Sequence, residues 1–199
     1  MSGIASGCAA LVAWIALARV AFVILGLIRQ AIRTRRTLTT RWGWVETLEA
    51  PEPFLLGIAV FLLYFRLPEP SAVNAGIPLA VFGALLAVAG AVITVWAMAT
   101  IPSLSAGHYV LRGQEVTASG PYAQVRHPMY FAVFLIWVGL AAAFASLTTF
   151  LVTILYVIPV YWMYARSEER MMLEQFGEPY RTYQERTGML FPKPKRSGV

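Results

Sequence analysis

The chain has 199 residues, of which 58% are hydrophobic and 13% charged, and its formal net charge is +6. Because a soluble domain carries about 25% charged residues, this composition excludes an ordinary soluble domain and is typical of an integral membrane protein. A single cysteine, Cys8, excludes an intrachain disulfide framework and a multi-cysteine metal site.

Five apolar segments predict an all-α, polytopic membrane protein with about five transmembrane helices. The segments are residues 4–28, 53–67, 77–101, 129–144 and 147–164. The second and fourth are short, which leaves open whether they cross the whole bilayer. Only Ala145 and Ser146 separate the last two segments, so we expect a tight helical hairpin there.

Two features of the spans predict how the helices pack. Arg19 interrupts the first span, and a charge in a span usually faces protein or water. We expect it to pair with a neighbouring helix, although a role in a functional site is the alternative. Gly83, Ala87 and Ala91 recur every four residues in the third span. This small-residue face suits close helix packing and would also permit a dimer, so the oligomeric state stays open.

The basic residues predict the orientation of the chain. Five spans place every arginine and lysine except Arg19 and Arg66 on one side of the membrane. The positive-inside rule assigns that side, with the C-terminus, to the cytosol and the N-terminus to the outside. Basic residues in loops between apolar runs reflect this topology, so we expect membrane lipids as partners and no nucleic acid.

The chain changes character after the last span. Residues 166–188 are charged and mostly good helix formers, and Gly177 is expected to end one helix while Pro179 opens another. We expect residues 1–100 to form a three-span membrane region. Residues 101–199 would form a catalytic region with short cytosolic helices, and the two regions would make one integrated domain.

A polar loop directly before the fourth span is the first candidate site. Pro128 disfavours helix at His127 and suits a helix start, so Arg126 and His127 should lie at the N-terminus of that span. Unpaired N–H groups and the helix dipole favour an anion there, and Arg126 could add a bidentate grip on a carboxylate. The alternative is that Arg126 reaches lipid headgroups and that Tyr130 is an interfacial aromatic residue.

Glu168 and Glu169 form the second candidate cluster. Adjacent acids on a helix face different sides, so one can be solvated while the other turns inward and needs a cation. Arg166 and Arg170 are local candidates, and a cationic ligand or a fully solvated helix are alternatives. Since His108 and His127 are the only histidines, we expect no histidine-rich metal site.

In order and spacing, these segments resemble the isoprenylcysteine carboxyl methyltransferase family and its relatives among the phospholipid N-methyltransferases. The resemblance covers about residues 100 to 192. The matching residues are 117–122 (TASGPY), 126–130 (RHPMY), Glu168-Glu169, Phe176-Gly177, Tyr180 and Tyr183.

The resemblance implies an S-adenosylmethionine-dependent membrane methyltransferase with a cytosol-facing cofactor pocket. A lipidic acceptor, foremost the carboxylate of an isoprenylcysteine-type small molecule or protein C-terminus, would enter from the bilayer. Together with Arg126 from the helix argument, the expected cofactor-binding residues are His108, Gln114, Glu115, Val116, Thr117, Tyr122, Arg126, His127, Pro128, Met129, Tyr130 and Glu168. Glu168 suits the ammonium of the cofactor, and Tyr122 and Tyr130 suit its adenine or sulfonium.

Three positions depart from the family pattern, and the one at Tyr164 concerns the acceptor. Carboxyl methyltransferases of this family carry an arginine where this chain has Tyr164, and the nearest arginine is Arg166. Gln114 replaces a usual histidine, and Ala132 stands where glycine is common. The expected catalytic residues are Tyr164, Arg166, Glu168 and Glu169.

Other functions stay open. A carboxylate acceptor needs no base, whereas an amine or alcohol would need one, with Glu169 or His127 as candidates. N- or O-methylation of another lipid is therefore an alternative within the same class. A non-enzymatic membrane scaffold or carrier, for which Arg126, His127 and Glu168 would be dispensable, and a membrane reductase are alternatives from other classes.

Overall fold

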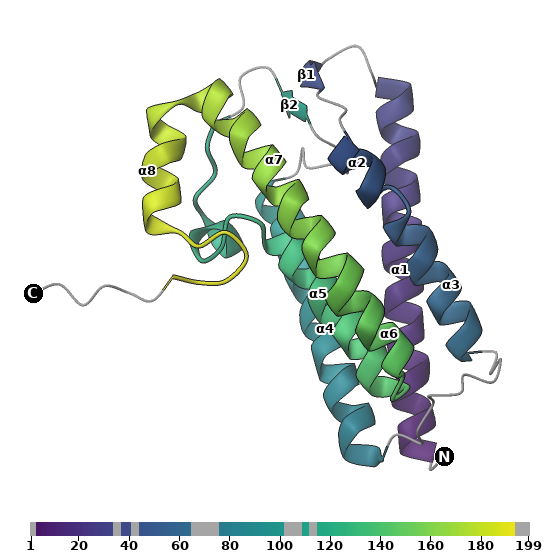
Figure 1. Ribbon diagram of the computed structural model, residues 1–199. Helices are drawn as coiled ribbons and strands as arrows, with labels where there is room; N and C mark the ends of the chain where they lie inside the picture. Colours follow the sequence, from purple (N-terminus) through teal and green to yellow (C-terminus); the bar gives the residue numbers. More distant parts are fainter. Residues whose placement is uncertain are drawn as a thin grey trace, which may run out of the picture.

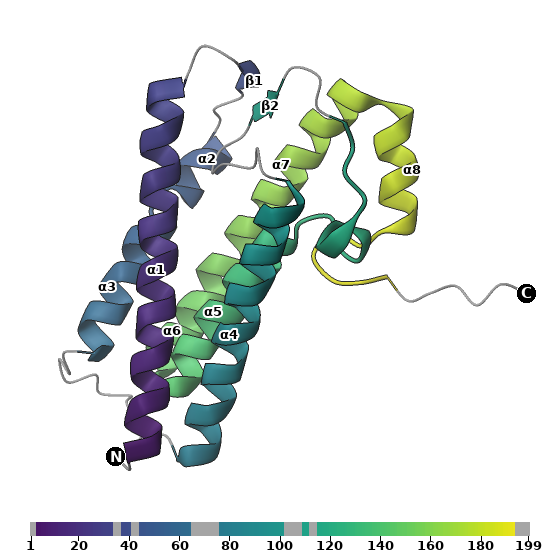
Figure 2. The same cartoon turned by 180° about the vertical axis from the view of Figure 1, so that it is seen from behind.

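The computed structural model describes residues 3–33, 37–40, 44–64, 76–101, 109–111 and 115–193. Within them, long helices run side by side and alternate in direction (Figures 1 and 2). The N-terminus lies at one end of this bundle, and α8 lies toward the other end. The principal helices are α1 (Gly3–Arg33), α3 (Glu52–Tyr64), α4 (Ile77–Thr100), α5 (Pro128–Ala143), α6 (Leu147–Val152), α7 (Ile158–Phe176) and α8 (Glu178–Arg186).

The expectation of a polytopic helical membrane protein is confirmed. Four helical stretches are long and apolar enough to cross a membrane: Gly3–Gly26, Thr47–Tyr64, Ile77–Thr100 and Leu147–Phe176. The second reaches this length only together with α2 (Trp44–Glu49), which precedes α3. The helix α5 has 16 residues. At 1.5 Å per residue it is about 24 Å long, less than the roughly 30 Å of a bilayer core.

The last span is longer than expected. A π-helical turn, Thr153–Val157, joins α6 to α7, and the helical stretch continues to Phe176. Glu168 and Glu169 therefore lie on the same helix as the span rather than on a separate one. As expected, Gly177 ends α7, with a φ of 61°, and Pro179 lies in the first turn of α8.

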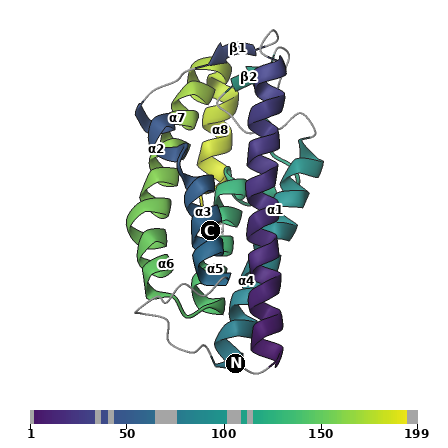
Figure 3. The same ribbon diagram turned by 90° about the vertical axis from the view of Figure 1, so that its right-hand side faces the viewer.

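A two-stranded ribbon is an element that the sequence did not predict. Strand β1 (Thr37–Thr40) pairs antiparallel with β2 (Tyr109–Leu111), with Thr37 opposite Leu111 and Thr40 opposite Tyr109. The ribbon lies at the end of the bundle where α7 turns into α8 (Figure 3). It joins the segment after α1 to the segment that follows α4.

The helices α4 and α5 are in backbone contact through glycine. A Cβ added at Gly83 would lie 2.6 Å from the carbonyl oxygen of Gly139, and one at Gly139 would lie 2.7 Å from that of Gly83. Ala87 is fully buried in the same contact. The small-residue face of the third span thus packs within the chain, where Gly83 and Ala87 are not available to a dimer.

The hairpin between α5 and α6 is as tight as expected. Ala145 adopts a φ of 47°, in the left-handed region that few residues other than glycine occupy. Ser146 caps α6, because its side-chain oxygen accepts a hydrogen bond of 3.1 Å from the backbone N–H of Thr149. The short connection places α5 and α6 next to each other as antiparallel neighbours.

Arg19 joins the helices as expected, within a buried polar network. Its Nη2 atom lies 2.9 Å from Oε2 of Glu52, at the start of α3, and 2.9 Å from the hydroxyl of Tyr161 on α7. Trp137 on α5 donates its indole N–H to Glu52 at 2.6 Å, and the hydroxyl of Tyr161 donates to Glu52 at 3.0 Å. Four helices are therefore held together by one fully buried carboxylate.

Candidate active site

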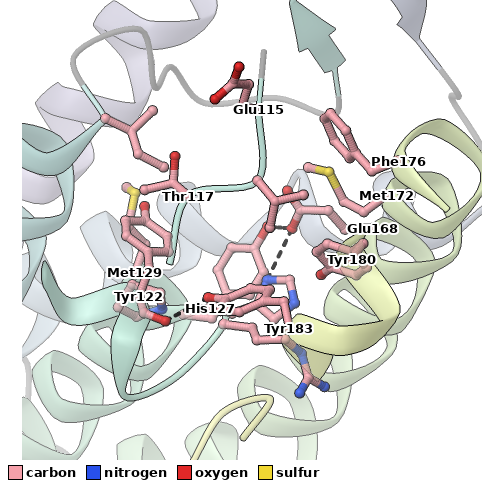
Figure 4. Close-up of a pocket in the computed structure, with 15 residues that line it drawn as sticks. Glu115, Thr117, Tyr122, His127, Met129, Glu168, Met172, Phe176, Tyr180 and Tyr183 are labelled. Atoms are coloured by element: carbon pink, nitrogen blue, oxygen red, sulfur yellow. Dashed lines mark hydrogen bonds and ion pairs between the residues drawn. The ribbon is translucent and has the colours of Figure 1, made fainter. Parts of the chain in front are cut away.

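A pocket with a volume of about 110 Å³ opens at the end of the bundle where α7 meets α8 (Figure 4). Its walls come from four parts of the chain: the end of α4, the segment that leads into the first turn of α5, the last turns of α7, and α8. The lining residues are Ile101, Glu115, Val116, Thr117, Tyr122, Arg126, His127, Pro128, Met129, Tyr130, Glu168, Met172, Phe176, Tyr180 and Tyr183.

Local structure explains why these side chains converge. A 3-10 helix, Gly120–Ala123, turns the chain so that Tyr122 is buried against the pocket. On α7, Glu168, Met172 and Phe176 are four residues apart and therefore share one face of the helix. The polar loop and the two-glutamate cluster thus meet in one place, as the sequence predicted.

Arg126 is already bound within the protein. Its Nε donates to Oε1 of Glu169 at 2.5 Å, and its Nη1 donates to the backbone carbonyls of Gln184, at 3.1 Å, and Thr187. The guanidinium therefore joins the loop before α5 to α7, to α8 and to the segment after α8. Nε and Nη1 of Arg126 are therefore not available to a ligand carboxylate or to lipid headgroups, although Arg126 also lines the pocket.

The N-terminus of α5 offers fewer free N–H groups than expected. The N–H of Arg126 donates to the carbonyl of Gly188 at 2.8 Å, and that of His127 donates to Met189 at 3.1 Å. Pro128 has no N–H to offer. The segment after α8 thus satisfies donors that would otherwise face an anion, because it pairs with the loop through the bridge between Val125 and Gly188.

His127 lies between the two glutamates. Its Nδ1 is 3.3 Å from Oε2 of Glu168, and its Nε2 is 3.4 Å from Oε1 of Glu169. The ring also stacks on Tyr130, with centroids 5.2 Å apart. Burial alone lowers the pKa of His127, but the two carboxylates outweigh this effect and raise the pKa above its ordinary value. The two carboxylates therefore favour the protonated form of His127.

The two adjacent glutamates face different partners, as expected from their spacing. Glu168 lines the pocket and accepts a hydrogen bond of 2.7 Å from the hydroxyl of Tyr130. Glu169 faces Arg126 and accepts a further hydrogen bond of 3.0 Å from Nε2 of Gln184. Glu169 is absent from the residues that line the described pocket, so its predicted catalytic role would be indirect.

The described partners of the two glutamates include Arg126, His127 and Tyr130, and Arg166, which was expected in the site, is not among the residues that line the described pocket. Arg166 is exposed, and its guanidinium lies over the ring of Trp162, 4.0 Å from the centroid. Arg166 and Glu168 are two residues apart on α7 and therefore point to different faces of the helix. The π-helical turn at Thr153–Val157 precedes both residues and does not change their relative orientation. Tyr164, in contrast, is buried and contacts the ring of Tyr130 edge-on at 5.7 Å.

Buried phenols form the wall opposite α7. The hydroxyl of Tyr183 donates to the backbone carbonyl of Tyr122 at 2.7 Å and ties α8 to the 3-10 helix. Burial raises the pKa of Tyr122, Tyr180 and Tyr183 above the ordinary value for tyrosine. These side chains are therefore neutral at physiological pH and cannot act as bases.

Two predicted residues, His108 and Gln114, lie outside the described residues. Five lining residues were not among the predicted site residues: Ile101, Met172, Phe176, Tyr180 and Tyr183. Helical spacing from Glu168 could have identified Met172 and Phe176. Tyr180 and Tyr183 belong to the motif that the sequence shares with the methyltransferase family, and that resemblance implies a pocket between the loop and the C-terminal helices.

Comparisons with known proteins agree with this geometry. The family described as "Phospholipid methyltransferase" matches residues 79–179, just over half of the chain. A nickel-cobalt-cadmium resistance protein, NccN, from Alcaligenes xylosoxydans xylosoxydans is 33% identical over 98 residues, 48% of this chain and 46% of that protein. Methanethiol S-methyltransferase from Pseudomonas deceptionensis is 34% identical over 77 residues, 38% of this chain and 28% of that protein.

The chain thus spans less than half the length of either relative. The matched family region begins within α4, contains both clusters of the pocket and ends at the start of α8. The chain belongs to the phospholipid methyltransferase family of membrane methyltransferases.

Proposed function

We propose that this protein transfers a methyl group from S-adenosylmethionine to a lipidic acceptor at the membrane surface. The observation that carries the proposal is the placement of Glu168, His127 and Tyr130 in one pocket, since these residues come from both segments of the family pattern. Because the described basic residues Arg126, Arg170, Arg181 and Arg186 lie in or beside the segments that form the pocket, the pocket end would face the cytosol and the N-terminus would lie outside.

The residues present suit the charges of the proposed cofactor. Glu168 offers a carboxylate to an ammonium or sulfonium group. His127 also lines the pocket, and the two glutamates that flank it favour its protonated form, which suits a carboxylate. Tyr122 supplies an aromatic surface for adenine. These features support binding in the pocket that the family membership implies.

The pocket must enlarge to admit this cofactor. Its volume of about 110 Å³ is below the roughly 300–1,000 Å³ of typical small-molecule sites. Met172 and Met129 line it, and methionine side chains adapt their shape readily. We expect these side chains and Phe176 to move when the cofactor binds.

The chemistry requires alignment more than acid–base catalysis. When bound, the cofactor supplies an electrophilic methyl group, and the pocket has to align the acceptor with it and exclude water. A carboxylate acceptor, such as that of an isoprenylcysteine, attacks without losing a proton. A thiol or amine acceptor would need a base, for which Glu168 and Glu115 are the carboxylates among the described lining residues.

Calorimetric binding of S-adenosylmethionine to the detergent-purified protein tests the cofactor assignment. We expect micromolar binding that falls by about tenfold or more in His127→Ala and Glu168→Ala, because each loses a charge-assisted contact. Arg166→Ala is the matched control and should bind normally, since Arg166 lies outside the pocket. A folded wild-type protein that binds no cofactor would refute the proposal.

A methylation assay with three acceptors tests the finer assignment. We expect N-acetyl-S-farnesylcysteine to be methylated in preference to phosphatidylethanolamine and methanethiol. Preference for phosphatidylethanolamine would shift the assignment to lipid N-methylation. Preference for methanethiol would shift it to the S-methylation named for the Pseudomonas deceptionensis relative.

A further inference from the structure

Arg19 is a cation inside a membrane span with part of its hydrogen-bonding capacity unused. Its side chain is 9% exposed, and both of its described polar contacts, to Glu52 and to Tyr161, use Nη2. Among the described residues, Nη1 is buried and has no hydrogen-bond partner. The ion pair with Glu52 therefore leaves one buried donor of Arg19, Nη1, unexplained.

An unused N–H group is more informative in a membrane span than in a soluble protein. A buried donor in a soluble protein commonly binds water. The bilayer core supplies no water, so a polar group left without a partner there costs several kcal/mol. A buried polar group that lacks a partner calls for an explanation, and a bound ligand is one that the bilayer permits.

The surroundings of Arg19 lead to the pocket. Arg19 holds the hydroxyl of Tyr161, whose ring lies 5.2 Å from that of Tyr130 and 6.4 Å from that of Tyr164. Tyr130 lines the pocket and donates to Glu168. Packed aromatic rings thus connect Tyr130, which lines the pocket, to the hydroxyl that Arg19 holds.

The contacts of Glu52 fix the orientation of the Arg19 guanidinium. Glu52 is 0% exposed and binds Nη2 of Arg19, the indole N–H of Trp137 and the hydroxyl of Tyr161. These contacts hold Arg19 in place before any ligand arrives. A preorganised donor of this kind lowers the ordering cost of binding.

We propose that Nη1 of Arg19 binds a carboxylate oxygen of the lipidic methyl acceptor and thereby selects carboxylate-bearing substrates. This inference rests on the proposed function. It assigns to a residue of α1 the acceptor recognition that Arg166 cannot provide from its exposed position over Trp162. A carboxylate suits the position because a charge-assisted hydrogen bond from a guanidinium is about twice as strong as a neutral one.

Direct binding of the acceptor, measured without cofactor, tests the inference independently of methyl transfer. N-acetyl-S-farnesylcysteine and its neutral amide are titrated into the full-length protein in nanodiscs. We expect the carboxylate to bind about tenfold or more tightly than the amide, because only the carboxylate gains a charge-assisted contact. Equal affinity of the two ligands for the wild type would overturn the inference.

Two variants assign the preference to Arg19. In Arg19→Gln the preference for the carboxylate over the amide should disappear, and Arg19→Lys should restore part of it. Arg166→Gln, the same change at an exposed arginine, should keep the full preference. A folded Arg19→Gln protein that still prefers the carboxylate would place its recognition elsewhere.

The cofactor measurement separates the two proposals. Arg19→Gln should bind S-adenosylmethionine within about twofold of the wild type, since Arg19 does not line the pocket. Loss of carboxylate preference with intact cofactor binding supports the inference. If the wild type binds the acceptor normally but binds no cofactor, the proposed methyl transfer is refuted, whereas recognition of the acceptor by Arg19 is not. If Arg19→Gln does not fold, the wild-type comparison of the two ligands decides.

Discussion

Two clusters of similar chemistry occupy different depths of this protein. Each contains an arginine–glutamate pair and a tyrosine that donates to a glutamate. The pocket cluster comprises Arg126, His127, Tyr130, Glu168 and Glu169. The span cluster comprises Arg19, Glu52, Trp137 and Tyr161. The first lies at the end of the bundle beside a pocket, and the second joins four helices within it.

The clusters differ in what they leave available. In the pocket cluster, Nε and Nη1 of Arg126 bind Glu169 and two backbone carbonyls, and Glu168 faces the pocket. In the span cluster the carboxylate, Glu52, is fully used, and the arginine keeps a free donor. One cluster therefore presents a carboxylate and the other a donor group of a cation, although Glu49 also lies beside the span cluster, 3.1 Å from the hydroxyl of Tyr161. This complementarity suits a cationic methyl donor and an anionic acceptor.

Removing the carboxylate of the span cluster should have the largest effect. Glu52→Ala leaves the charge of Arg19 buried without its partner, and such a change costs about 3–5 kcal/mol. We expect a correspondingly lower free energy of unfolding in detergent. It can be measured by SDS titration followed by circular dichroism.

A paired variant checks this reason. Arg19→Met combined with Glu52→Leu removes both charges, so it should recover much of the stability that Glu52→Ala loses. Glu115→Ala, which removes an exposed carboxylate, is the control and should change stability by less than about 0.5 kcal/mol. A double variant less stable than Glu52→Ala would mean that polar contacts other than the charge pair dominate.

Removing the cation of the pocket cluster should have the next largest effect. Arg126→Ala leaves Glu169 and the carbonyls of Gln184 and Thr187 without their partner. We expect a loss of about 2–3 kcal/mol in stability and weaker cofactor binding, because α8 loses a tie to the pocket. Thermal unfolding and calorimetry measure the two effects.

The matched control for Arg126 is another arginine near the pocket. Arg181 is 66% exposed, and its pair with Glu178 is 3.8 Å long. Such surface pairs contribute about 0–1 kcal/mol, so Arg181→Ala should leave cofactor binding unchanged. Equal effects of the two substitutions would contradict the role of Arg126 as the residue that joins these segments.

The sequence predicted the pocket cluster much better than the span cluster. Arg126 and His127 are adjacent, and so are Glu168 and Glu169, so their order and spacing revealed a family pattern. Local signals also predicted the start of α5 at Pro128 and the end of α7 at Gly177. Such features depend on neighbours in the chain, which a single sequence displays directly.

What the sequence did not predict depends on contacts between distant residues. Arg19, Glu52 and Tyr161 come from three helices, and no local pattern shows that they meet. The same limit explains why Arg126 was expected to be free: Glu169 and Thr187 lie 43 and 61 residues away along the chain. Tertiary packing, rather than propensity, decides these positions.

The pH dependence of stability should also differ between the pocket cluster and the span cluster, although by a smaller amount. The raised pKa of His127 means that its protonated form is favoured by folding. This stabilisation is fully present below the unfolded pKa of about 6.5 and is lost as pH rises through the raised folded pKa. The span cluster contains no histidine, so the pH effect should belong to the pocket alone.

Melting temperatures measured across this pH range check the assignment. The wild type should become less stable as pH rises through the folded pKa, and His127→Gln should remove this component of the curve. Identical curves for the two proteins would show that the neighbouring carboxylates do not hold His127 in its protonated form.

The smallest effect is expected at Arg166, which belongs to neither cluster. An exposed cation–π contact contributes about 0.5–1 kcal/mol, so Arg166→Ala should lower the melting temperature only slightly. Methylation of a farnesylcysteine analogue should keep its KM and kcat, because the guanidinium lies over Trp162 and outside the pocket. A large rise in KM with normal cofactor binding would mean that Arg166 leaves Trp162 when the acceptor binds. In that case acceptor recognition would lie at the exposed face of α7 rather than at the span cluster.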